Sequence, residues 1–317
     1  MKSAFLWGYY GYDNFGDELM FRACTELLKK SGFETIVVPL PHGRETNGIR
    51  SVSKFSPVIV EVLRRVDISV AGGGELLQDA TSFRSILYYY TLSKLALMNR
   101  KKLIFLGNSL GTLRRRLSRA MVRDILGDEN TYFIARDMVS YRYARLFCKN
   151  VFLGTDPSVL SLMNTKVDVQ KSRKKVVFFL KQPLDLSLVV KVLKEMGFED
   201  LCISKAFPGD CDAYPPFSRE DDVLSAILSS SLVITERFHP ALVAAFFGIP
   251  FVVVQNLKAR RFLERYLSTS DWYSRKDQLD ISLKLPKVVE MKEPAGDMMR
   301  EDAVKMEETF LSIVRGR

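Results

Sequence analysis

Histidine and cysteine, the residues on which metal centres and disulfide scaffolds depend, are scarce in this sequence. Its 317 residues include only two histidines and four cysteines. No two of the cysteines have the Cys-x-x-Cys spacing of a zinc site or a redox pair. Metal chemistry built on several histidines is therefore excluded, and we expect free thiols in a reducing compartment.

Long hydrophobic runs are also missing. The longest apolar stretches, residues 86–98 and 241–254, are interrupted by Lys94 and by Gly248-Ile249-Pro250. Both are shorter than the roughly 20 residues that a helix needs to cross a bilayer. The first eight residues reach glycine before the apolar core of a signal peptide can form. We therefore expect a cytoplasmic chain with no transmembrane anchor.

Acidic residues are outnumbered by basic ones. The chain carries 47 lysines and arginines against 37 aspartates and glutamates, a formal net charge of +10. Such an excess suggests an acidic partner, and nucleic acid, a membrane surface and an anionic substrate all fit that description. Apolar residues (47%) and charged residues (26%) occur at the frequencies of a soluble globular protein, so a disordered or fibrous chain is excluded.

Apolar segments that alternate with helical patterns predict an α/β fold with parallel sheets. The expected strands cover residues 4–7, 35–38, 68–71, 103–106, 132–135, 151–153, 176–180, 201–203, 232–234 and 251–254. The expected helices cover residues 18–30, 57–65, 82–98, 115–126, 138–147, 186–196, 221–230, 240–247, 259–267 and 296–314.

A polar, basic stretch at residues 164–175 interrupts this alternation and is typical of a linker. We therefore predict two Rossmann-like domains that face a cleft, residues 1–165 on the probable acceptor side and residues 166–317 with the donor site and the last helix. A chain about twice the length of a typical domain agrees with this division. Ligands of open α/β sheets bind beyond the carboxyl ends of the strands, so the residues that follow the strands are the site candidates.

The first candidate is a glycine- and tyrosine-rich loop, Gly8-Tyr9-Tyr10-Gly11-Tyr12, after the first strand. Its spacing matches neither the dinucleotide-binding G-x-G-x-x-G motif nor a Walker A motif. One interpretation is a glycine loop followed by a capped helix. The other is a sugar site, with the tyrosines as a flat face and hydroxyl groups bound by the polar side chains that follow: Asp13, Asn14, Asp17 or Glu18.

A second glycine cluster, Gly72-Gly73-Gly74, follows the third strand. Close approach of a ligand to the backbone explains it, and close packing of a helix on the sheet explains it equally well. In the first interpretation, Gln78 and Asp79 are polar groups of the binding site.

The most specific cluster follows the strand at residues 232–234. Pro240 suits the first position of a helix, so we expect His239 near its N-cap. A helix N-terminus attracts anions, Arg237 adds a planar donor fork, and His239 adds an imidazole, a type of side chain that can gain or lose a proton near neutral pH. Lys181 and Lys258 also follow strands of the second domain and extend the basic character of this edge.

Six motifs follow one another along the chain: G-Y-Y-G-Y-D-N-F-G-D-E, G-G-G-E-L-L-Q-D, G-N-S-L-G, A-R-D-M-V-S, T-D-P and R-F-H-P-A-L-V-A-A-F-F-G-I-P. In this order they resemble the polysaccharide pyruvyl transferase family. The resemblance runs from about residue 8 to residue 258. Three elements depart from the family pattern: Glu75 replaces a fourth glycine, Lys181 replaces an arginine and so loses the bidentate fork, and only Lys258 remains of an S-Y-D-P-K-like segment.

The resemblance implies a GT-B-like fold and transfer of a pyruvyl group from phosphoenolpyruvate to a sugar, which gives a ketal in a cell-surface polymer or its lipid-linked precursor. It implies no metal and no cofactor. Arg237, Lys181 and Lys258 would bind the donor. His239 would donate a proton, with Asp17 or Glu18 as the base for the acceptor hydroxyl. The acceptor would lie against Gly11, Asp13, Asn14, Gly73, Gly74, Gln78 and Asp79.

Two other functions remain open on the residues themselves. A nucleotide-sugar glycosyltransferase would use Arg237 for a diphosphate and Asp17 as its base. A non-catalytic protein that binds membranes or polymers would use the basic amphipathic helix that begins near Arg114-Arg115-Arg116, and the same helix would give an enzyme a peripheral contact at the inner membrane face. Nucleic acid is not expected, because no motif accompanies the charge.

Overall fold

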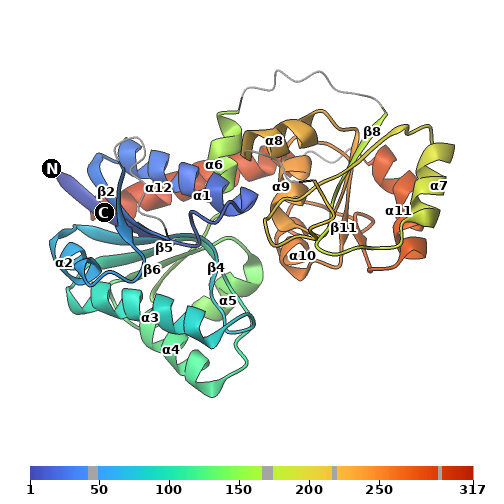
Figure 1. Ribbon diagram of the computed structural model, residues 1–317. Coiled ribbons are helices and arrows are strands. Elements are labelled where there is room, and N and C mark those ends of the chain that lie inside the picture. Colours follow the sequence, from blue (N-terminus) through green and yellow to red (C-terminus); the bar gives the residue numbers. More distant parts are fainter. Residues whose placement is uncertain (42–48, 166–173, 216–219, 292–294, 317) are drawn as a thin grey trace. The chain divides into compact units, whose positions relative to one another are not determined.

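The computed structural model describes residues 1–41, 49–165, 174–215, 220–291 and 295–316, and the chain folds into two compact units (Figure 1). The first unit contains Met1–Tyr12, Asp17–Ser161 and Glu301–Arg317, and the second contains Asp13–Gly16 and Leu162–Arg300. The main division falls after Ser161, and the sequence predicts the boundary after residue 165. Most of the last helix, however, belongs to the first unit, and a short N-terminal segment belongs to the second. The expected linker at residues 164–175 lies largely outside the described residues.

The first unit is built on a seven-stranded sheet in the order β3-β2-β1-β4-β5-β6-β7. All neighbouring strands are parallel, as buried apolar runs joined by helices predict. The strands are β1 (Lys2–Trp7), β2 (Phe33–Leu40), β3 (Ile49–Ser53), β4 (Ile68–Leu77), β5 (Lys102–Leu110), β6 (Thr131–Ala135) and β7 (Asn150–Leu153).

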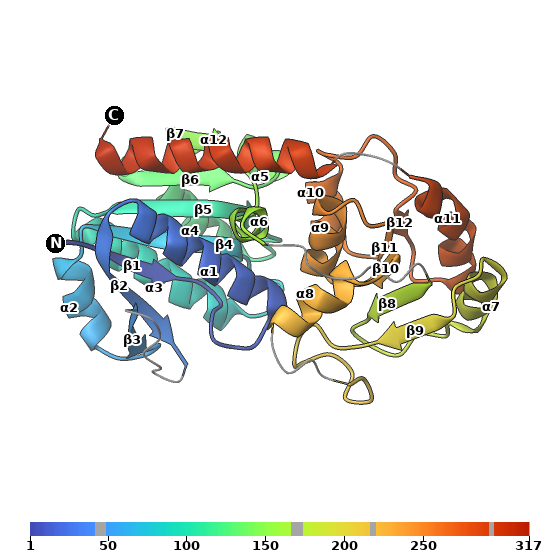
Figure 2. The same cartoon turned by 90° about the horizontal axis from the view of Figure 1, so that it is seen from above.

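Helices cover both faces of this sheet (Figure 2). The four helices α2 to α5 bury apolar side chains on one face, while α1 and α12 lie on the other. Local capping fixes several starts: the Ser82 side chain accepts a hydrogen bond at the start of α3, and Asp137 does so at the start of α5. The helices are α1 (Phe15–Lys30), α2 (Val58–Arg65), α3 (Phe83–Met98), α4 (Arg116–Leu126), α5 (Met138–Ala144), α6 (Ser158–Met163) and α12 (Ala295–Arg315).

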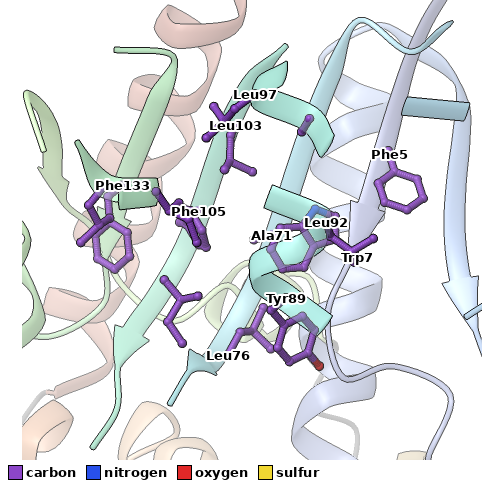
Figure 3. Close-up of a cluster of buried hydrophobic side chains, with 14 of the residues drawn as sticks. Phe5, Trp7, Ala71, Leu76, Tyr89, Leu92, Leu97, Leu103, Phe105 and Phe133 are labelled. Atoms are coloured by element: carbon purple, nitrogen blue, oxygen red, sulfur yellow. The ribbon is translucent and has the colours of Figure 1, made fainter. Parts of the chain in front are cut away.

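Large aromatic side chains fill the core between the sheet and α3 (Figure 3). Trp7 stacks on Tyr89 with ring centroids 5.6 Å apart and meets the edge of Phe105 at 6.0 Å. The indole N–H of Trp7 donates to the Ser69 hydroxyl at 2.9 Å, so its polar atom is satisfied inside the core. This packing anchors the end of β1 and the loop that follows it.

The second unit has a five-stranded parallel sheet in the order β12-β11-β10-β8-β9. Its strands are β8 (Lys175–Phe179), β9 (Asp200–Ile203), β10 (Leu232–Thr235), β11 (Phe251–Val254) and β12 (Tyr273–Ser274). Its helices are α7 (Ser187–Glu195), α8 (Glu220–Leu228), α9 (Phe238–Phe246), α10 (Leu257–Leu263) and α11 (Gln278–Glu290).

In each sheet, successive strands along the chain are added first on one side and then, after a single switch, on the other. In the first sheet the switch lies between β1 and β4, and in the second it lies between β8 and β10. Open α/β sheets bind their ligands at the carboxyl edge of such a switch point. The two glycine clusters follow or extend β1 and β4, and Lys181 and Arg237 follow β8 and β10. These predicted site residues therefore lie at the two switch points, whereas Lys258 follows β11.

Two strands continue past their predicted ends. β4 runs through Gly73 and Gly74, and β5 runs through Gly107; all three glycines have positive φ angles, of 71°, 83° and 65°. The register shifts near these glycines, as it does at a β-bulge, where glycine adopts the conformation at little cost. The glycine run is therefore part of a bulged strand and not a loop after it.

Within the ranges given above, no helix is long and apolar enough to cross a membrane. The same residues contain no group of three or more histidine, cysteine, aspartate or glutamate side chains that could hold a metal ion.

Candidate functional site

The glycine run of β4 packs closely against its neighbours. A Cβ atom on Gly72 would overlap the Tyr10 hydroxyl, and one on Gly73 would overlap the Met20 side chain of α1. Gly74 is less crowded. A Cβ atom there would lie 3.8 Å from the Met20 side chain and 3.9 Å from a carboxylate oxygen of Asp17. Close packing of the helix and the loop therefore explains Gly72 and Gly73, and Gly74 alone faces space near a carboxylate.

The three tyrosines after β1 do not act together. Tyr10 is only 1% exposed, and its hydroxyl donates to the Gly72 carbonyl oxygen. The expectation that all three tyrosines form one flat face is therefore wrong for Tyr10, because its ring is part of the core. Tyr9 and Tyr12 are partly exposed and stack on each other, with centroids 4.4 Å apart and planes 13° apart.

Asp17 and Glu18 lie in the first turn of α1, as predicted. The Gly11 N–H donates to Oε1 of Glu18 at 2.8 Å, which closes the loop over the helix end. Gly11 itself has a positive φ of 77° and lies close to Pro41. Burial, followed by the neighbouring charges of Tyr12 and Asp17, raises the pKa of Tyr9, so Asp17 acts electrostatically on the ring pair.

Asp13 and Asn14 lie in the segment that is part of the second unit. Asp13 is exposed and has a left-handed φ of 54°, a conformation that aspartate tolerates better than most residues. Their roles as acceptor ligands stay predictions.

Gln78 and Asp79 are buried and engaged in local hydrogen bonds. The Gln78 amide donates to the Thr81 hydroxyl at 2.5 Å. The backbone N–H groups of Arg114 and Arg115 donate to Asp79 at 2.7 and 2.9 Å. Burial opposes ionisation of Asp79, but these donors and the charge of Arg115 lower its pKa to about 2. The Asp79 side chain therefore holds the turn before α4, and the Gln78 side chain holds the turn before α3.

A buried polar network follows β5, β6 and β7, where sequence reasoning found only weak signals. Nη1 of Arg136 lies 2.5 Å from Oδ2 of Asp156, and the two side chains are 3% and 0% exposed. Nε of Arg136 donates to the Ser109 hydroxyl, which donates in turn to Asp137. Asp137 and Ser140 then tie the start of α5 to β5. The A-R-D and T-D-P motifs thus meet in one structural network.

In the second unit, Arg237 follows β10 and pairs with a buried carboxylate. Nε and Nη2 of Arg237 both bind Oδ1 of Asp210, and its guanidinium lies over the Phe207 ring at 5.1 Å. The backbone N–H groups of Ala206 and Phe207 donate to the other Asp210 oxygen. The side chain of Arg237 is still 23% exposed, so the loop that contains Asp210 orients the arginine without enclosing it.

Glu236 joins the same edge to two further segments. Its Oε2 accepts the Lys181 backbone N–H at 2.7 Å, and its Oε1 lies 2.9 Å from Nζ of Lys276. The Asn256 amide donates to the Glu236 carbonyl oxygen and, through its own oxygen, caps α10 at Lys258. Sequence reasoning missed Asp210, Lys276 and the role of Glu236, because no local pattern pairs residues this far apart along the chain.

The three predicted donor-binding cations lie close enough to influence one another. Burial, followed by the positive charges of Arg237 and Lys258, lowers the pKa of Lys181, against the opposing effect of Glu236 and Asp210. Lys276, which pairs with Glu236, adds a fourth basic side chain to this edge. Such an edge attracts an anion with more than one negative charge.

His239 is the second residue of α9, and Arg237 occupies the N-cap position. The expected helix start at Pro240 is therefore two residues late. Every residue of α9 except His239 is buried, and the imidazole stacks obliquely on Phe238 with centroids 4.7 Å apart. A Cβ atom on Gly16 would overlap the imidazole ring, so glycine at position 16 is required for this contact.

Comparison with known proteins bears on this arrangement. The model of a protein family described as polysaccharide pyruvyl transferase matches residues 14–257, which is most of the chain. The chain belongs to the polysaccharide pyruvyl transferase family. It is therefore an enzyme of this type, and the match includes β4, β8 and β10 but begins after β1. No curated protein matches the sequence.

Solved structures show the fold of this pyruvyl transferase family member. The UDP-GlcNAc 2-epimerase from Neisseria meningitidis, bound to UDP-GlcNAc, is 10% identical with a TM-score of 0.65, and the match covers 98% of this chain and 100% of that one. The UDP-GlcNAc 2-epimerase from Methanocaldococcus jannaschii is 12% identical, with the same TM-score and coverage. The wall teichoic acid polymerase TagF is 12% identical with a TM-score of 0.56, over 99% and 88% of the two chains. The expected GT-B-like fold class is confirmed.

Proposed function

We propose that this enzyme transfers the pyruvyl group of phosphoenolpyruvate to a sugar of a cell-surface polysaccharide or of its lipid-linked precursor. The single observation that supports the donor most strongly is the cation cluster after β8 and β10. Phosphoenolpyruvate carries a phosphate and a carboxylate, and a group of basic side chains at the carboxyl edge of the sheet suits such a ligand. A cytoplasmic location agrees with this donor.

Arg237 is the best-organised donor ligand. Asp210 and Phe207 fix its guanidinium plane, so little side-chain entropy is lost when a phosphate or carboxylate binds to the exposed part. Lys181 and Lys258 add point charges from two neighbouring segments. We assign the phosphate and the carboxylate of the donor to these three cations together.

The reaction that we propose needs one proton donor and one proton acceptor. His239 protonates the methylene carbon of phosphoenolpyruvate, and the adjacent carbon becomes cationic. A sugar hydroxyl adds to that carbon while Asp17 or Glu18 takes its proton. The carbon–oxygen bond to phosphate then breaks, and phosphate leaves with the proton that Asp17 or Glu18 had taken. A second sugar hydroxyl then adds to the same carbon, closes the ketal and gives its proton to His239, which restores the acid. No oxidant, reductant or metal enters this balance.

A ligand screen tests the donor. We expect phosphoenolpyruvate to raise the melting temperature of the purified protein, and nucleotide sugars to raise it less. The Lys258→Met variant should lose this shift, whereas Lys191→Met, at an exposed position of α7, should keep it. Stabilisation by a nucleotide sugar alone would favour a glycosyltransferase and overturn the proposal.

A further inference from the structure

An aromatic cluster with a lysine at its centre lies beside the first switch point. Tyr9 and Tyr12 follow β1, Lys54 and Phe55 follow β3, and Tyr88 lies in α3. The Lys54 ammonium lies 4.9, 5.2 and 5.9 Å from the ring centroids of Tyr88, Tyr12 and Tyr9. It also donates to the Tyr12 hydroxyl at 3.2 Å, and Tyr88 donates to the Lys54 carbonyl oxygen at 3.2 Å. We call these five residues the aromatic platform.

The Phe55 ring lies at the outer edge of the platform, and the other four residues leave most of it exposed. Phe55 is 81% exposed although its ring meets the Tyr88 ring edge-on at 5.5 Å. Within the part of the chain that the structure describes, no carboxylate forms an ion pair with Lys54. The positive charge therefore lies among aromatic faces, where cation–π contacts hold it in place.

We propose that the aromatic platform binds an anionic sugar unit of the acceptor, with the sugar ring against Phe55 or Tyr88 and its negative group on Lys54. This inference rests on the proposed function in that the ligand is the acceptor. A sugar ring has a flat C–H face that packs on aromatic rings, and the fixed ammonium selects a carboxylate or phosphate substituent. A uronate within the polymer and a sugar phosphate of a precursor share this chemistry.

Direct titration of the protein with sugars distinguishes a uronate from a sugar phosphate as the ligand. Because phosphoenolpyruvate is left out, it also tests the platform separately from the proposed donor. The probes are a short oligogalacturonate, its neutral counterpart of equal length, and glucose 1-phosphate, each followed by calorimetry. We expect the oligogalacturonate or the sugar phosphate to bind more tightly than the neutral sugar. Phe55→Ala should weaken binding of every probe about tenfold, and Lys54→Met should remove the preference for negative charge.

Met98→Ala is the matched control, because Met98 is 75% exposed and lies at the far end of α3. Unchanged binding of all three probes by both platform variants would overturn the inference and leave a purely structural cluster. A platform that binds anionic sugars in a protein that ignores phosphoenolpyruvate would instead refute the proposed donor. The two failures are therefore distinguishable.

A second inference concerns the solvent-facing side of α4, and different residues carry it. Five arginines lie within ten residues, at 114, 115, 116, 119 and 123, and all five are exposed. Arg114 and Arg115 precede α4 and the other three lie in it, as does Leu117, which is 55% exposed. The opposite side of α4 is buried in the core.

The neighbouring helix α5 repeats this combination. Arg142 and Arg145 are exposed, and Val139 and Leu146 are 55% and 70% exposed. The guanidinium of Arg123 in α4 lies 4.9 Å from the Phe147 ring just after α5, so the two helices share one surface. Arginines around exposed aliphatic side chains match an anionic lipid surface, where the aliphatic groups enter the headgroup region.

We infer that this α4–α5 surface docks on an anionic bilayer. The purified protein should sediment with vesicles that contain phosphatidylglycerol and not with vesicles of phosphatidylcholine alone. Arg116→Gln and Arg119→Gln should each weaken binding about fivefold, and Leu117→Ala should weaken it further.

The control is the pair Lys305→Gln and Arg315→Gln in α12, on the opposite face of the sheet. Equal loss of binding in this control would show that net charge alone matters and would overturn the docking surface. Binding to soluble polygalacturonate through the same arginines, without vesicle binding, would assign the surface to an acidic polymer instead.

Discussion

Removal of Arg136 should destabilise the first unit strongly. Its guanidinium pairs with Asp156 at 2.5 Å and donates to Ser109 at 2.7 Å, and both charged side chains are almost fully buried. Arg136→Ala leaves the Asp156 carboxylate in the core without its cation. Loss of one partner of a buried pair typically costs about 3–5 kcal/mol.

The matched comparison is Lys94→Ala. Lys94 pairs with Asp124 at 3.0 Å, but these side chains are 32% and 46% exposed, so the expected loss is below about 1 kcal/mol. Denaturant unfolding and calorimetry should report a clear loss for Arg136→Ala, with a fall in melting temperature of roughly 6–20 °C. Equal, small losses in the two variants would refute the view that the A-R-D and T-D-P motifs form a structural network.

Three further predictions follow from the site geometry. Gly16→Ala should lower the rate of phosphate release at least tenfold with little change in secondary structure by circular dichroism, because a Cβ atom there displaces the His239 ring; an unchanged rate would refute the contact. The lowered pKa of Asp79 means that its contribution to stability is complete above about pH 4, its ordinary range, and is lost as the pH falls toward 2. The protection of the amides before α4 against hydrogen exchange, taken relative to their intrinsic exchange rates, should fall in that window. Constant protection would contradict this. Because the pKa of Lys181 is lowered, its ammonium group loses its proton at a lower pH than that of an ordinary lysine. As the pH rises, the affinity for phosphoenolpyruvate should therefore begin to fall at this lower pH. Titrations at several pH values should show this fall, and Lys181→Met should abolish it.

The sequence predicts the parallel sheets well, because their strands are short apolar runs buried on both faces. It fails where backbone conformation decides: β4 and β5 extend through glycines with positive φ angles, and apolar periodicity carries no signal of a bulge. It also misses β3, whose sequence Ile-Arg-Ser-Val-Ser is half polar, and α11, which has Pro286 inside the helix where proline normally ends one.

The candidate site divides in the same way. Position after a strand was enough to bring Lys181, Arg237 and Lys258 to one edge, because parallel strands end on the same side of a sheet. Asp210, which binds the Arg237 guanidinium, and Glu236, which accepts the Lys181 backbone N–H, act across long sequence separations. A single sequence gives no pattern for such pairs, so they emerge only from the fold.

The central claim is that this enzyme makes a pyruvate ketal from phosphoenolpyruvate, and mass analysis of the acceptor after incubation with both substrates tests it most directly. We predict an acceptor that gains one pyruvate ketal for each phosphate released, and loss of both signals in His239→Ala. An acceptor that gains a sugar from a nucleotide sugar, or a His239→Ala variant with an unimpaired yield, would contradict the account.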